Sequence, residues 1–449
     1  MKNKNDVAKK PPMGWNSWDC YGAAVNEEQL IGNAEYMRDN LKKYGWEYVV
    51  CDIQWYEPKA KNTDYNNFTE LCMDEYSRLI PAENRFPSSK NGVGFKNIAD
   101  RIHGMGLKFG IHIMRGIPRQ AVHNNTKILG TDITARQIAH HFSVCPWNTD
   151  MYGVDTRVKG AQEYYNSLFK LYAEWGVDFV KADDIANTEF KPNEPYSARE
   201  EIEMIRRAID SCGRDMVLSL SPGPAQVEVA DHLMKNANMW RMTGDFWDVW
   251  DKLYEMFEKT EKWYPYVGEG CWPDCDMLPL GNISVNGTCH GPQNRYTQFT
   301  KDEQITLMTL WSIFRSPLMF GGEMRNNDEW TLSLITNEEI LDINQNSHSA
   351  KPVFDDGKTI VWQSISAREN PVIAVFNADK AEREIAVDLE ELGISGEHTL
   401  RDLWKKENVG RVNNKLTVTV NPHGAKIYEL YKAKEIKNVK SYSRQDTVC

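Results

Sequence analysis

The sequence of 449 residues predicts an α/β protein in which a (β/α)8 TIM barrel is followed by a C-terminal antiparallel β-sandwich domain. From about residue 10 to 345, short apolar segments alternate with amphipathic helical ones, as in parallel βα units. An open, doubly wound sheet would share this rhythm, but no Gly-x-Gly-x-x-Gly follows the first strand. Near residue 350 the pattern changes to short alternating strands. We therefore expect a barrel at 10–348, a β-sandwich at 349–432 and a flexible polar tail at 433–449.

Eight apolar segments are the candidate barrel strands, because their length and apolar content suit strands that are buried in a parallel sheet. They span residues 12–18, 47–55, 107–114, 177–183, 216–221, 237–243, 264–270 and 316–322. Segments with helical spacing lie between the early strands, and each ends on a glycine, which is typical of a helix C-terminus. These span residues 27–45, 94–106, 158–176 and 197–213.

Beyond residue 350, apolar and polar residues alternate over short segments that are separated by turn residues. Such segments predict the strands of a β-sandwich. They span residues 351–366, 370–380, 383–392, 397–404 and 415–430.

Composition restricts the classes of function. The formal net charge is −11, and because nucleic-acid binding needs a basic surface, we expect no nucleic-acid partner. No apolar run reaches about 18 residues, so we expect no membrane span. The chain contains 15 Trp and 19 Tyr, whose flat rings could pack on sugar rings, although most of them must serve ordinary core packing.

The N-terminal segment MKNKNDVAKK is charged and lacks the apolar region of a signal peptide. The sequence thus predicts either a cytosolic protein or an exported one whose signal peptide has been removed. The nine cysteines are scattered, without a Cys-x-x-Cys pair. We expect mostly free, buried thiols, and a local disulfide among Cys271, Cys275 and Cys289 stays open for an exported protein.

Chemistry is expected at the carboxyl ends of the strands, where the active sites of such barrels lie. Polar and aromatic residues follow the predicted strands at this rim. They are Trp18, Asp52, Trp55, His112, Arg115, Lys181, Asp183, Asp184, Arg241, Asp245, Asp274 and Asp276. The Asp-Cys-Asp triplet at 274–276 could suggest a divalent cation, but we favour carboxylate chemistry without a metal ion.

Two carboxylates on different strands each follow a cation. Lys181 precedes Asp183 by two residues, and Arg241 precedes Asp245 by four. A nearby cation keeps a carboxylate ionised, whereas a carboxyl group that donates a proton needs a raised pKa. Two carboxyl groups with these two roles are what a glycosidase requires. The alternative is that each aspartate caps a helix or forms a structural ion pair.

Adjacent carboxylates at the end of the fourth predicted strand need separate interpretations. Side chains alternate along a strand, so Lys181 and Asp183 share a direction and Asp184 points the other way. We therefore expect Asp183 to serve the chemistry and Asp184 to order or cap the loop that follows.

Several motifs occur in order along the chain. They are PPMGWNSWDCYG (11–22), CDIQW (51–55), NRFPSSKNGVGFKNIADRIHGMGLKFGI (84–111), WGVDFVKADD (175–184), MWRMTGDFWDVW (239–250), WPDCDML (272–278) and MTLWSIFRSPLMFGGEMR (308–325). Together they resemble glycoside hydrolase family 27, the melibiase-like family of α-galactosidases and α-N-acetylgalactosaminidases. The resemblance covers almost the whole chain. It implies a barrel followed by an antiparallel β-domain, and hydrolysis with retained configuration by double displacement.

The resemblance also implies roles for individual residues. Asp183 matches the nucleophile of the family's Lys-x-Asp motif, and Asp245, four residues after an arginine, matches the acid/base. In retaining enzymes the two carboxyl groups lie about 5–5.5 Å apart. The mechanism requires no metal ion or other cofactor. The matching substrate-binding residues are Trp18, Asp52, Lys181, Arg241 and Asp276.

This sequence departs from the family pattern at three places. Ile53 replaces a second aspartate on strand 2, so one polar contact to the O4/O6 edge of the sugar is missing. His112 replaces a tyrosine at the end of strand 3, where it or Arg115 could compensate. The loop at 219–227, SLSPGPAQV, has small residues that would leave room for a 2-acetamido group. The further expected substrate-binding residues are Trp55, His112 and Ser221.

These observations lead to a retaining exo-acting α-galactosidase as the main functional hypothesis. An α-N-acetylgalactosaminidase or a β-L-arabinopyranosidase on the same scaffold is the alternative, because L-arabinopyranose shares the ring stereochemistry of galactose and lacks C6. A glycan-binding protein without catalysis is the alternative from another class. The expected partner is a small glycoside, oligosaccharide or glycan substrate, and the sequence is compatible with an oligomer.

Overall fold

The computed structural model describes residues 3–188, 198–287 and 291–432. The chain divides into two compact units. The first combines Met1–Phe299 with Arg315–Thr336, and the second combines Thr300–Phe314 with Asn337–Cys449. The expected domain boundary at 348–349 stays a prediction, and the expected tail at 433–449 lies outside the described residues.

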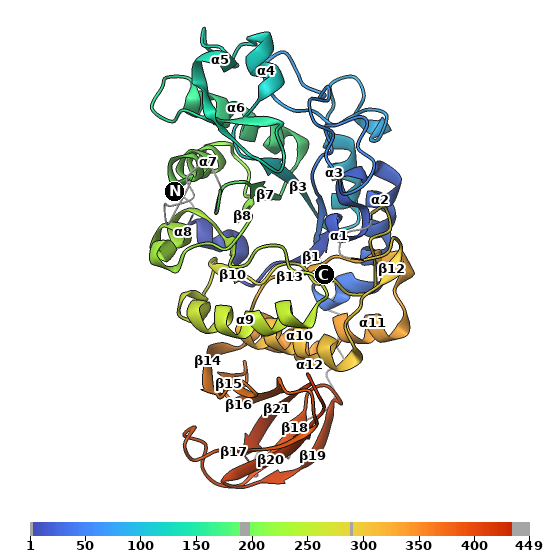
Figure 1. Ribbon diagram of the computed structural model, residues 1–449, viewed down its shortest axis with the longest axis vertical. Helices are drawn as coiled ribbons and strands as arrows, with labels where there is room; N and C mark the ends of the chain where they lie inside the picture. Colours follow the sequence, from blue (N-terminus) through green and yellow to red (C-terminus); the bar gives the residue numbers. More distant parts are fainter. Residues whose placement is uncertain (1–2, 189–197, 288–290, 433–449) are drawn as a thin grey trace, which may run out of the picture. The chain divides into compact units, whose positions relative to one another are not determined.

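The first unit is built on a parallel sheet that has eight strands within the described part of the chain (Figure 1). Its order is β10-β9-β8-β7-β3-β2-β1-β13, and an isolated parallel bridge between Leu278, beyond β10, and Phe320 links the two edges. This is a (β/α)8 arrangement, which confirms the predicted fold class. The strands are β1 (Met13–Asn16), β2 (Tyr48–Cys51), β3 (Lys108–Met114), β7 (Phe179–Asp183), β8 (Val217–Leu220), β9 (Met239–Arg241), β10 (Trp272–Asp274) and β13 (Leu318–Phe320).

The sheet encloses a packed core. Because successive strand residues point to opposite faces, one set of side chains from the strands meets in a single cluster. The cluster contains Tyr48, Val50, Phe179, Val217, Met239, Trp272, Met277 and Met319, with Trp18 partly buried against it. At Gly14 a Cβ atom would lie 2.4 Å from the carbonyl oxygen of Tyr48, so the close approach of β1 to β2 requires glycine there.

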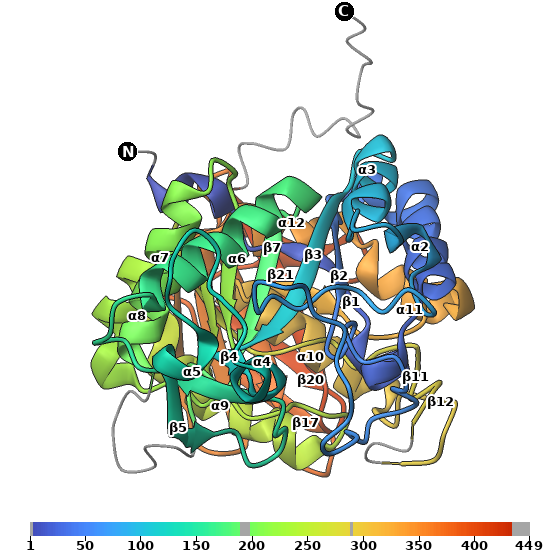
Figure 2. The ribbon, with the colours of Figure 1, turned by 90° about the horizontal axis from the view of Figure 1, so that it is seen from above.

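Helices surround this sheet (Figure 2). The expected helices at 94–106, 158–176 and 197–213 are present, whereas the one at 27–45 is α-helical only to Tyr36 and continues as a π turn and a 3-10 turn. The α-helices of this unit are α1 (Trp18–Tyr21), α2 (Glu27–Tyr36), α3 (Lys96–Gly104), α4 (Arg119–Asn124), α5 (Ala135–Ile138), α6 (Ala161–Trp175), α7 (Arg199–Ser211), α8 (Ala230–Asn236), α9 (Trp250–Trp263) and α11 (Glu329–Ile335). The π turn is η3 (Met37–Leu41), and the 3-10 turns are η1 (Lys4–Ala8), η2 (Gly22–Ala24), η4 (Lys42–Tyr44), η5 (Pro87–Ser89), η6 (Val227–Val229), η7 (Tyr264–Tyr266) and η8 (Met324–Asn326).

The seventh barrel strand lies later in the chain than expected. The expected segment 264–270 begins with the 3-10 turn η7, which contains Pro265, and ends where Gly268 pairs back on Cys271. The strand is β10, whose sequence is Trp-Pro-Asp. A proline lacks the N–H that an inner strand must donate, but β10 is at the edge of the sheet, where proline is tolerated.

A long insertion separates β3 from α6. It contains a small sheet of order β4-β6-β5, formed by Ile117–Pro118, Met151–Val154 and Ala139–Val144, together with α4 and α5. The insertion is hydrogen-bonded to the loop that follows β2, since the side chain of Gln120 exchanges bonds of 2.8 and 2.9 Å with the backbone of Leu71. Beyond β10, β11 (Asn282–Ile283) pairs with β12 (Arg295–Tyr296).

The second unit contains α10 (Lys301–Phe314), α12 (Glu338–Asn346) and an antiparallel β-sandwich. Its larger sheet has the order β14-β15-β16-β21-β18-β19, and β17 pairs with β20. The strands are β14 (His348–Asp355), β15 (Thr359–Ile365), β16 (Pro371–Asn377), β17 (Arg383–Asp388), β18 (His398–Asp402), β19 (Glu407–Val412), β20 (Lys415–Val420) and β21 (Ala425–Lys432). Inward-facing apolar residues of both sheets, such as Ile373, Val418 and Leu430, form one core cluster. β19 was not expected, because nearly all of its residues are exposed.

The structure also bears on the expectations for the cysteines and for membrane spans. The seven cysteines within the described ranges are free, including Cys271 and Cys275, and Cys289 lies outside those ranges. A disulfide between Cys271 and Cys275 is therefore ruled out in this structure. None of the helices in the described residues is long and apolar enough to cross a membrane.

Candidate active site

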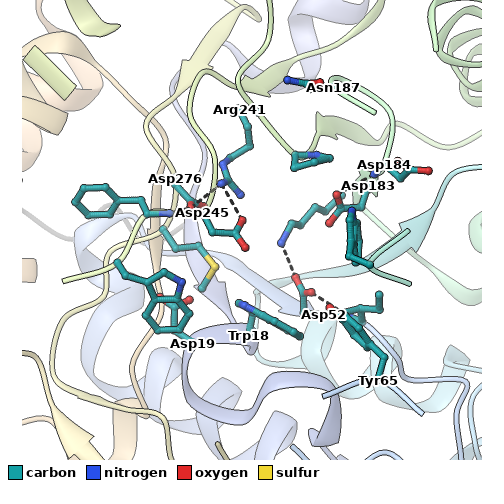
Figure 3. A pocket seen from close by; sticks show the side chains of 18 residues that line it. Trp18, Asp19, Asp52, Tyr65, Asp183, Asp184, Asn187, Arg241, Asp245 and Asp276 are labelled. Carbon is teal, nitrogen blue, oxygen red and sulfur yellow. Dashed lines mark hydrogen bonds and ion pairs between the residues drawn. The ribbon is translucent and has the colours of Figure 1, made fainter. Parts of the chain in front are cut away.

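A pocket of about 510 Å³ lies at the carboxyl ends of the barrel strands. Side chains from six strand ends or the loops just beyond them converge on it (Figure 3). Eight of the rim residues expected from the sequence line the pocket, namely Trp18, Asp52, Lys181, Asp183, Asp184, Arg241, Asp245 and Asp276.

Asp183 is the last residue of β7, and its carboxylate is held at both oxygens. Nε2 of His112 lies 2.9 Å from Oδ2, and the backbone N–H of Asp184 donates to Oδ1 at 2.8 Å. Burial by itself raises the pKa of Asp183, but the hydrogen bond and electrostatic attraction from His112, followed by the charge of Lys181, outweigh burial and lower it to about 2. Because an ionised carboxylate only accepts hydrogen bonds, His112 is the donor in this pair.

Lys181 and Asp52 form an ion pair beside the Asp183 carboxylate. Nζ of Lys181 donates to Oδ2 of Asp52 at 2.9 Å, and Nδ2 of Asn16 donates to the same oxygen at 2.7 Å. Burial raises the pKa of Asp52, but the positive charge of Lys181 lowers it below its ordinary value. Burial likewise lowers the pKa of Lys181, and Asp52 and Asp183 more than offset this. The pocket thus presents a fixed cation and a fixed anion side by side.

Arg241 bridges two further carboxylates of the pocket. Its Nη2 donates to Oδ1 of Asp245 at 3.1 Å and lies 2.9 Å from Oδ2 of Asp276. The side chain of Asp245 is 64% exposed, whereas that of Asp276 is 9% exposed. Burial raises the pKa of Asp276 more than the charge of Arg241 lowers it. Asp245 is therefore at the solvent side of the pocket, and Asp276 forms part of its wall.

Asp184 points away from Asp183, as strand alternation predicted, and joins a buried ion network. Nη2 and Nε of Arg115 donate to its Oδ2 at 2.7 Å and to its backbone oxygen at 2.6 Å. Nη1 of Arg115 donates to Glu201 on α7 at 2.9 Å and to Ser143 on β5 at 2.8 Å. The Asp183–Asp184 turn is thus fixed by a cation that is itself doubly paired.

Trp55 and His112 do not line the pocket, contrary to expectation. Trp55 is fully buried, donates its indole N–H to the backbone oxygen of His112 at 2.8 Å, and packs edge-on against Phe95 and Trp175. It lies four residues beyond the end of β2, where the chain has already turned and alternation no longer predicts direction. His112 is fully buried behind Asp183, so it contacts the carboxylate and not the pocket.

Ser221 is also outside the pocket, which corrects the expectation for the loop after β8. Its backbone bonds to Ala182 and Ile185 place it in the sheet edge, and it is almost fully buried. Pro222 and Gly223, the next two residues, line the pocket in its place. The expected loop thus reaches the pocket through these two residues, and its role in substrate binding stays a prediction.

Residues to which the sequence assigned no role complete the pocket. They are Asp19, Tyr65, Trp147, Asn187, Phe246, Trp247 and Met277. Asp19 directly follows Trp18 in the first motif, a position that could have indicated it. Its carboxyl group is buried, and within the described residues its Oδ2 has no hydrogen-bond partner. Burial, followed by the charge of Asp276, raises the pKa of Asp19 well above its ordinary value.

Aromatic rings form one side of the pocket. Trp18 and Tyr65 are stacked with their centroids 6.0 Å apart and their planes at 21°, and Trp147 follows at 5.8 Å from Tyr65 with a tilt of 43°. Tyr65 comes from the loop after β2 and Trp147 from the insertion after β3. A sugar has apolar C–H faces and polar edges, and this pocket offers both kinds of surface.

The arrangement suits substitution at an acetal carbon. One carboxylate is buried and ionised, and a second, exposed carboxylate in the same pocket could exchange protons with a leaving group or with water. Among the residues that the structure describes, no group of three or more His, Cys, Asp or Glu side chains is arranged to hold a metal ion.

Comparison with family models and curated proteins gives consistent matches. Residues 149–346 match a model described as alpha galactosidase A, and residues 356–430 match an alpha galactosidase C-terminal beta sandwich domain. Alpha-galactosidase 2 of Arabidopsis thaliana is 26% identical over 439 residues, which cover 97% of this chain and 92% of that protein.

Two solved structures match at higher identity. A family 27 β-L-arabinopyranosidase from Geobacillus stearothermophilus, in complex with arabinose, is 57% identical, with a TM-score of 0.94 and coverage of 96% of this chain and 100% of that one. A candidate α-N-acetylgalactosaminidase from Bacillus halodurans C-125 is 53% identical, with a TM-score of 0.84 and coverage of 94% and 97%.

Proposed function

Because the chain belongs to glycoside hydrolase family 27, and is thus a glycosidase, we propose that it is a retaining exo-acting enzyme with Asp183 as nucleophile and Asp245 as acid/base. The contrast between these two carboxylates in one pocket carries the proposal. Asp183 is held ionised by His112 and Lys181, whereas Asp245 is exposed at the solvent side. A retaining glycosidase needs this division between a nucleophile and a proton donor.

The first step forms a covalent intermediate. A carboxylate oxygen of Asp183 attacks the anomeric carbon, the bond to the leaving oxygen breaks, and Asp245 gives its proton to that oxygen. In the second step Asp245 takes a proton from water, the water oxygen attacks the anomeric carbon, and the ester bond to Asp183 breaks. Two inversions return the sugar with its original configuration. Asp183 then leaves as a carboxylate that His112 and Lys181 stabilise.

The remaining charged residues bind the sugar hydroxyls. Lys181 donates and Asp52 accepts on the inner side of the pocket, next to the nucleophile. Arg241 and Asp276 act near the 2-position, and the ring of Trp18 covers an apolar face. Because Lys181, Asp52 and Arg241 are already fixed by ion pairs, little reorganisation accompanies substrate binding.

Terminal β-L-arabinopyranose is the substrate that the pocket favours. Arabinopyranose has the ring stereochemistry of galactose but lacks C6 and its hydroxyl. Ile53, which lines the pocket beside Asp52, presents an apolar surface where the family pattern has a second aspartate, so a 6-hydroxyl would lose a hydrogen-bond acceptor. The 57% identical relative from Geobacillus is a β-L-arabinopyranosidase. Terminal α-D-galactose, the main expectation from the sequence, would then be a weaker substrate.

A 2-acetamido sugar is the second candidate. Pro222 and Gly223 line the pocket after β8. Neither carries a polar side chain that would bond a 2-hydroxyl. The 53% identical relative is a candidate α-N-acetylgalactosaminidase, in line with this option.

A substrate panel tests the proposal. We expect the highest kcat/KM on nitrophenyl β-L-arabinopyranoside, a lower value on the α-D-galactoside, and the first-formed anomer seen by NMR to have retained configuration. Ile53→Asp should shift the ratio towards the galactoside, and Ile53→Val is its control. A wild-type preference for the galactoside or the α-N-acetylgalactosaminide would overturn the substrate assignment alone. Absence of hydrolysis of all three would leave the non-catalytic alternative.

A further inference from the structure

We propose that Trp147 and Tyr65 form a binding subsite for the leaving group, and that this leaving group is the pyranose ring of a neighbouring sugar. The inference rests on the proposed function, because it extends the same pocket beyond the sugar that is released. Neither residue follows a strand of the barrel sheet directly: Tyr65 comes from the long loop after β2, and Trp147 from the connection between β5 and β6 in the insertion after β3.

The exposure of the pocket residues gives the direction in which a leaving group must extend. The nucleophile side is closed, since the side chain of Asp183 is 12% exposed, whereas Asp245 is 64% exposed. The leaving oxygen must lie within reach of Asp245, so the group attached to it extends toward the open side. Trp147 is 38% exposed and lines the same pocket, so an apolar ring face is available there.

The two rings continue the aromatic wall outward. Trp18 stacks on Tyr65, and Tyr65 is tilted against Trp147 at 5.8 Å. Trp18 covers the released sugar, and Trp147 lies two ring contacts further along the wall. A second pyranose ring presents the same kind of C–H face to Trp147, which makes a sugar the chemically matching leaving group.

Hydrogen bonds to the loop after β2 fix the loop that carries Trp147. Three residues further on, Asp150 accepts hydrogen bonds from Gln54 Nε2 at 2.5 Å and from the Tyr56 hydroxyl at 3.3 Å, both from the loop after β2. Thr149 donates to Asn67 at 3.4 Å, two residues from Tyr65. The loops that carry the two rings are therefore fastened to each other, so the rings are preorganised for stacking.

Comparing two leaving groups tests the proposal. One substrate is a disaccharide in which the preferred terminal sugar is linked to a pyranose, and the other is the corresponding glycosyl fluoride, whose leaving group has no ring. Trp147→Ala should lower the ratio of kcat/KM on the disaccharide to that on the fluoride about tenfold, because only the disaccharide loses a stacked ring. Trp147→Phe should restore most of the ratio.

Phe142→Ala is the matched control, because Phe142 is an 89% exposed aromatic residue of the same insertion that does not line the pocket. We expect it to leave the ratio unchanged. An unchanged ratio in Trp147→Ala, or the same fall in Phe142→Ala, would overturn the subsite and leave the proposed function intact. Failure of the wild-type protein to hydrolyse either substrate would overturn the proposed function, and the subsite with it.

Discussion

At the scale of single residues, the pair Asp183 and Asp184 shows how strand geometry separates two adjacent carboxylates. Asp183 faces the pocket and accepts from His112, while Asp184 faces the buried guanidinium of Arg115. The backbone adapts at this point, because Asp184 has a left-handed φ of 54°. The two acids therefore never share a proton, and each is stabilised by its own cation or hydrogen-bond donor.

Replacing His112 should change the pH dependence of catalysis. The folded-state pKa of Asp183, about 2, is below its ordinary value because of His112 and Lys181, so this carboxyl group is ionised at mildly acidic and neutral pH. Without the imidazole donor, burial raises this pKa. We expect the acid limb of kcat/KM to move to higher pH in His112→Phe, and to move less in His112→Gln, which keeps a donor. An identical acid limb in wild type and His112→Phe would contradict the assigned role.

Breaking the ion network behind Asp183 should destabilise the fold. Asp184→Asn removes one of the two anionic partners of the buried Arg115, and removing one member of a buried pair costs about 3–5 kcal/mol. The free energy of unfolding from denaturant titration measures this loss. Asp155→Asn is the control, since Asp155 pairs with an exposed Arg157 and such pairs contribute little. Equal losses of unfolding free energy in the two variants would contradict the proposed contribution of the buried network to stability.

The residues of the pocket divide by how far they lie from a strand. Asp52, Lys181, Asp183 and Arg241 are at or within two residues of a strand end, so alternation and the strand-end rule predict them. Trp55 lies beyond a turn of the chain, where the period of two no longer holds. Tyr65, in the loop after β2, and Trp147, in the insertion after β3, lie on loops that are joined by hydrogen bonds that no local pattern encodes.

At the scale of elements, most strands were predictable because they are buried on both faces and apolar throughout. The seventh strand was predicted too early in the chain. Both the expected segment and β10 contain a proline, and the proline of β10 is acceptable only because β10 lies at the edge of the sheet. β19 was missed for the opposite reason, since its exposed residues carry no apolar alternation. The insertion after β3 has short strands whose pairing depends on distant partners.

The packing of β1 on β2 leads to a prediction at this scale. A Cβ atom at Gly14 would meet the backbone oxygen and Cβ of Tyr48 at 2.4 and 2.6 Å. Gly14→Ala should therefore lower the free energy of unfolding by about 1–3 kcal/mol or more, because the contact involves backbone that cannot move aside. Gly104→Ala, at a helical glycine with no atom within 4 Å, should instead be neutral or stabilising by up to about 1 kcal/mol. Thermal unfolding of both variants checks this contrast.

At the scale of the whole molecule, the described pocket residues all belong to the first compact unit. A cavity in the core of the second unit should consequently lower stability without changing the chemistry. Ile373→Ala removes a fully buried side chain of that core and should cost about 2–5 kcal/mol. Calorimetry should show a lower unfolding temperature for this variant, with unchanged kcat at 25 °C.

Val409→Ala, at a 41% exposed residue of β19, is the control for that variant and should alter neither quantity. A fall of kcat in Ile373→Ala well below its unfolding temperature would mean that the second unit contributes to catalysis.

The roles of Asp183 and Asp245 are the central claim, and the configuration of the product formed with azide tests them most directly. Asp183→Ala and Asp245→Ala are each incubated with an activated nitrophenyl glycoside and azide, and NMR identifies the anomer of the glycosyl azide. Without the nucleophile, azide attacks the sugar directly, so Asp183→Ala should yield the inverted azide. Without the acid/base, azide attacks the covalent intermediate, so Asp245→Ala should yield the retained azide. The opposite pairing, or undiminished hydrolysis by Asp183→Ala, would contradict the assignment.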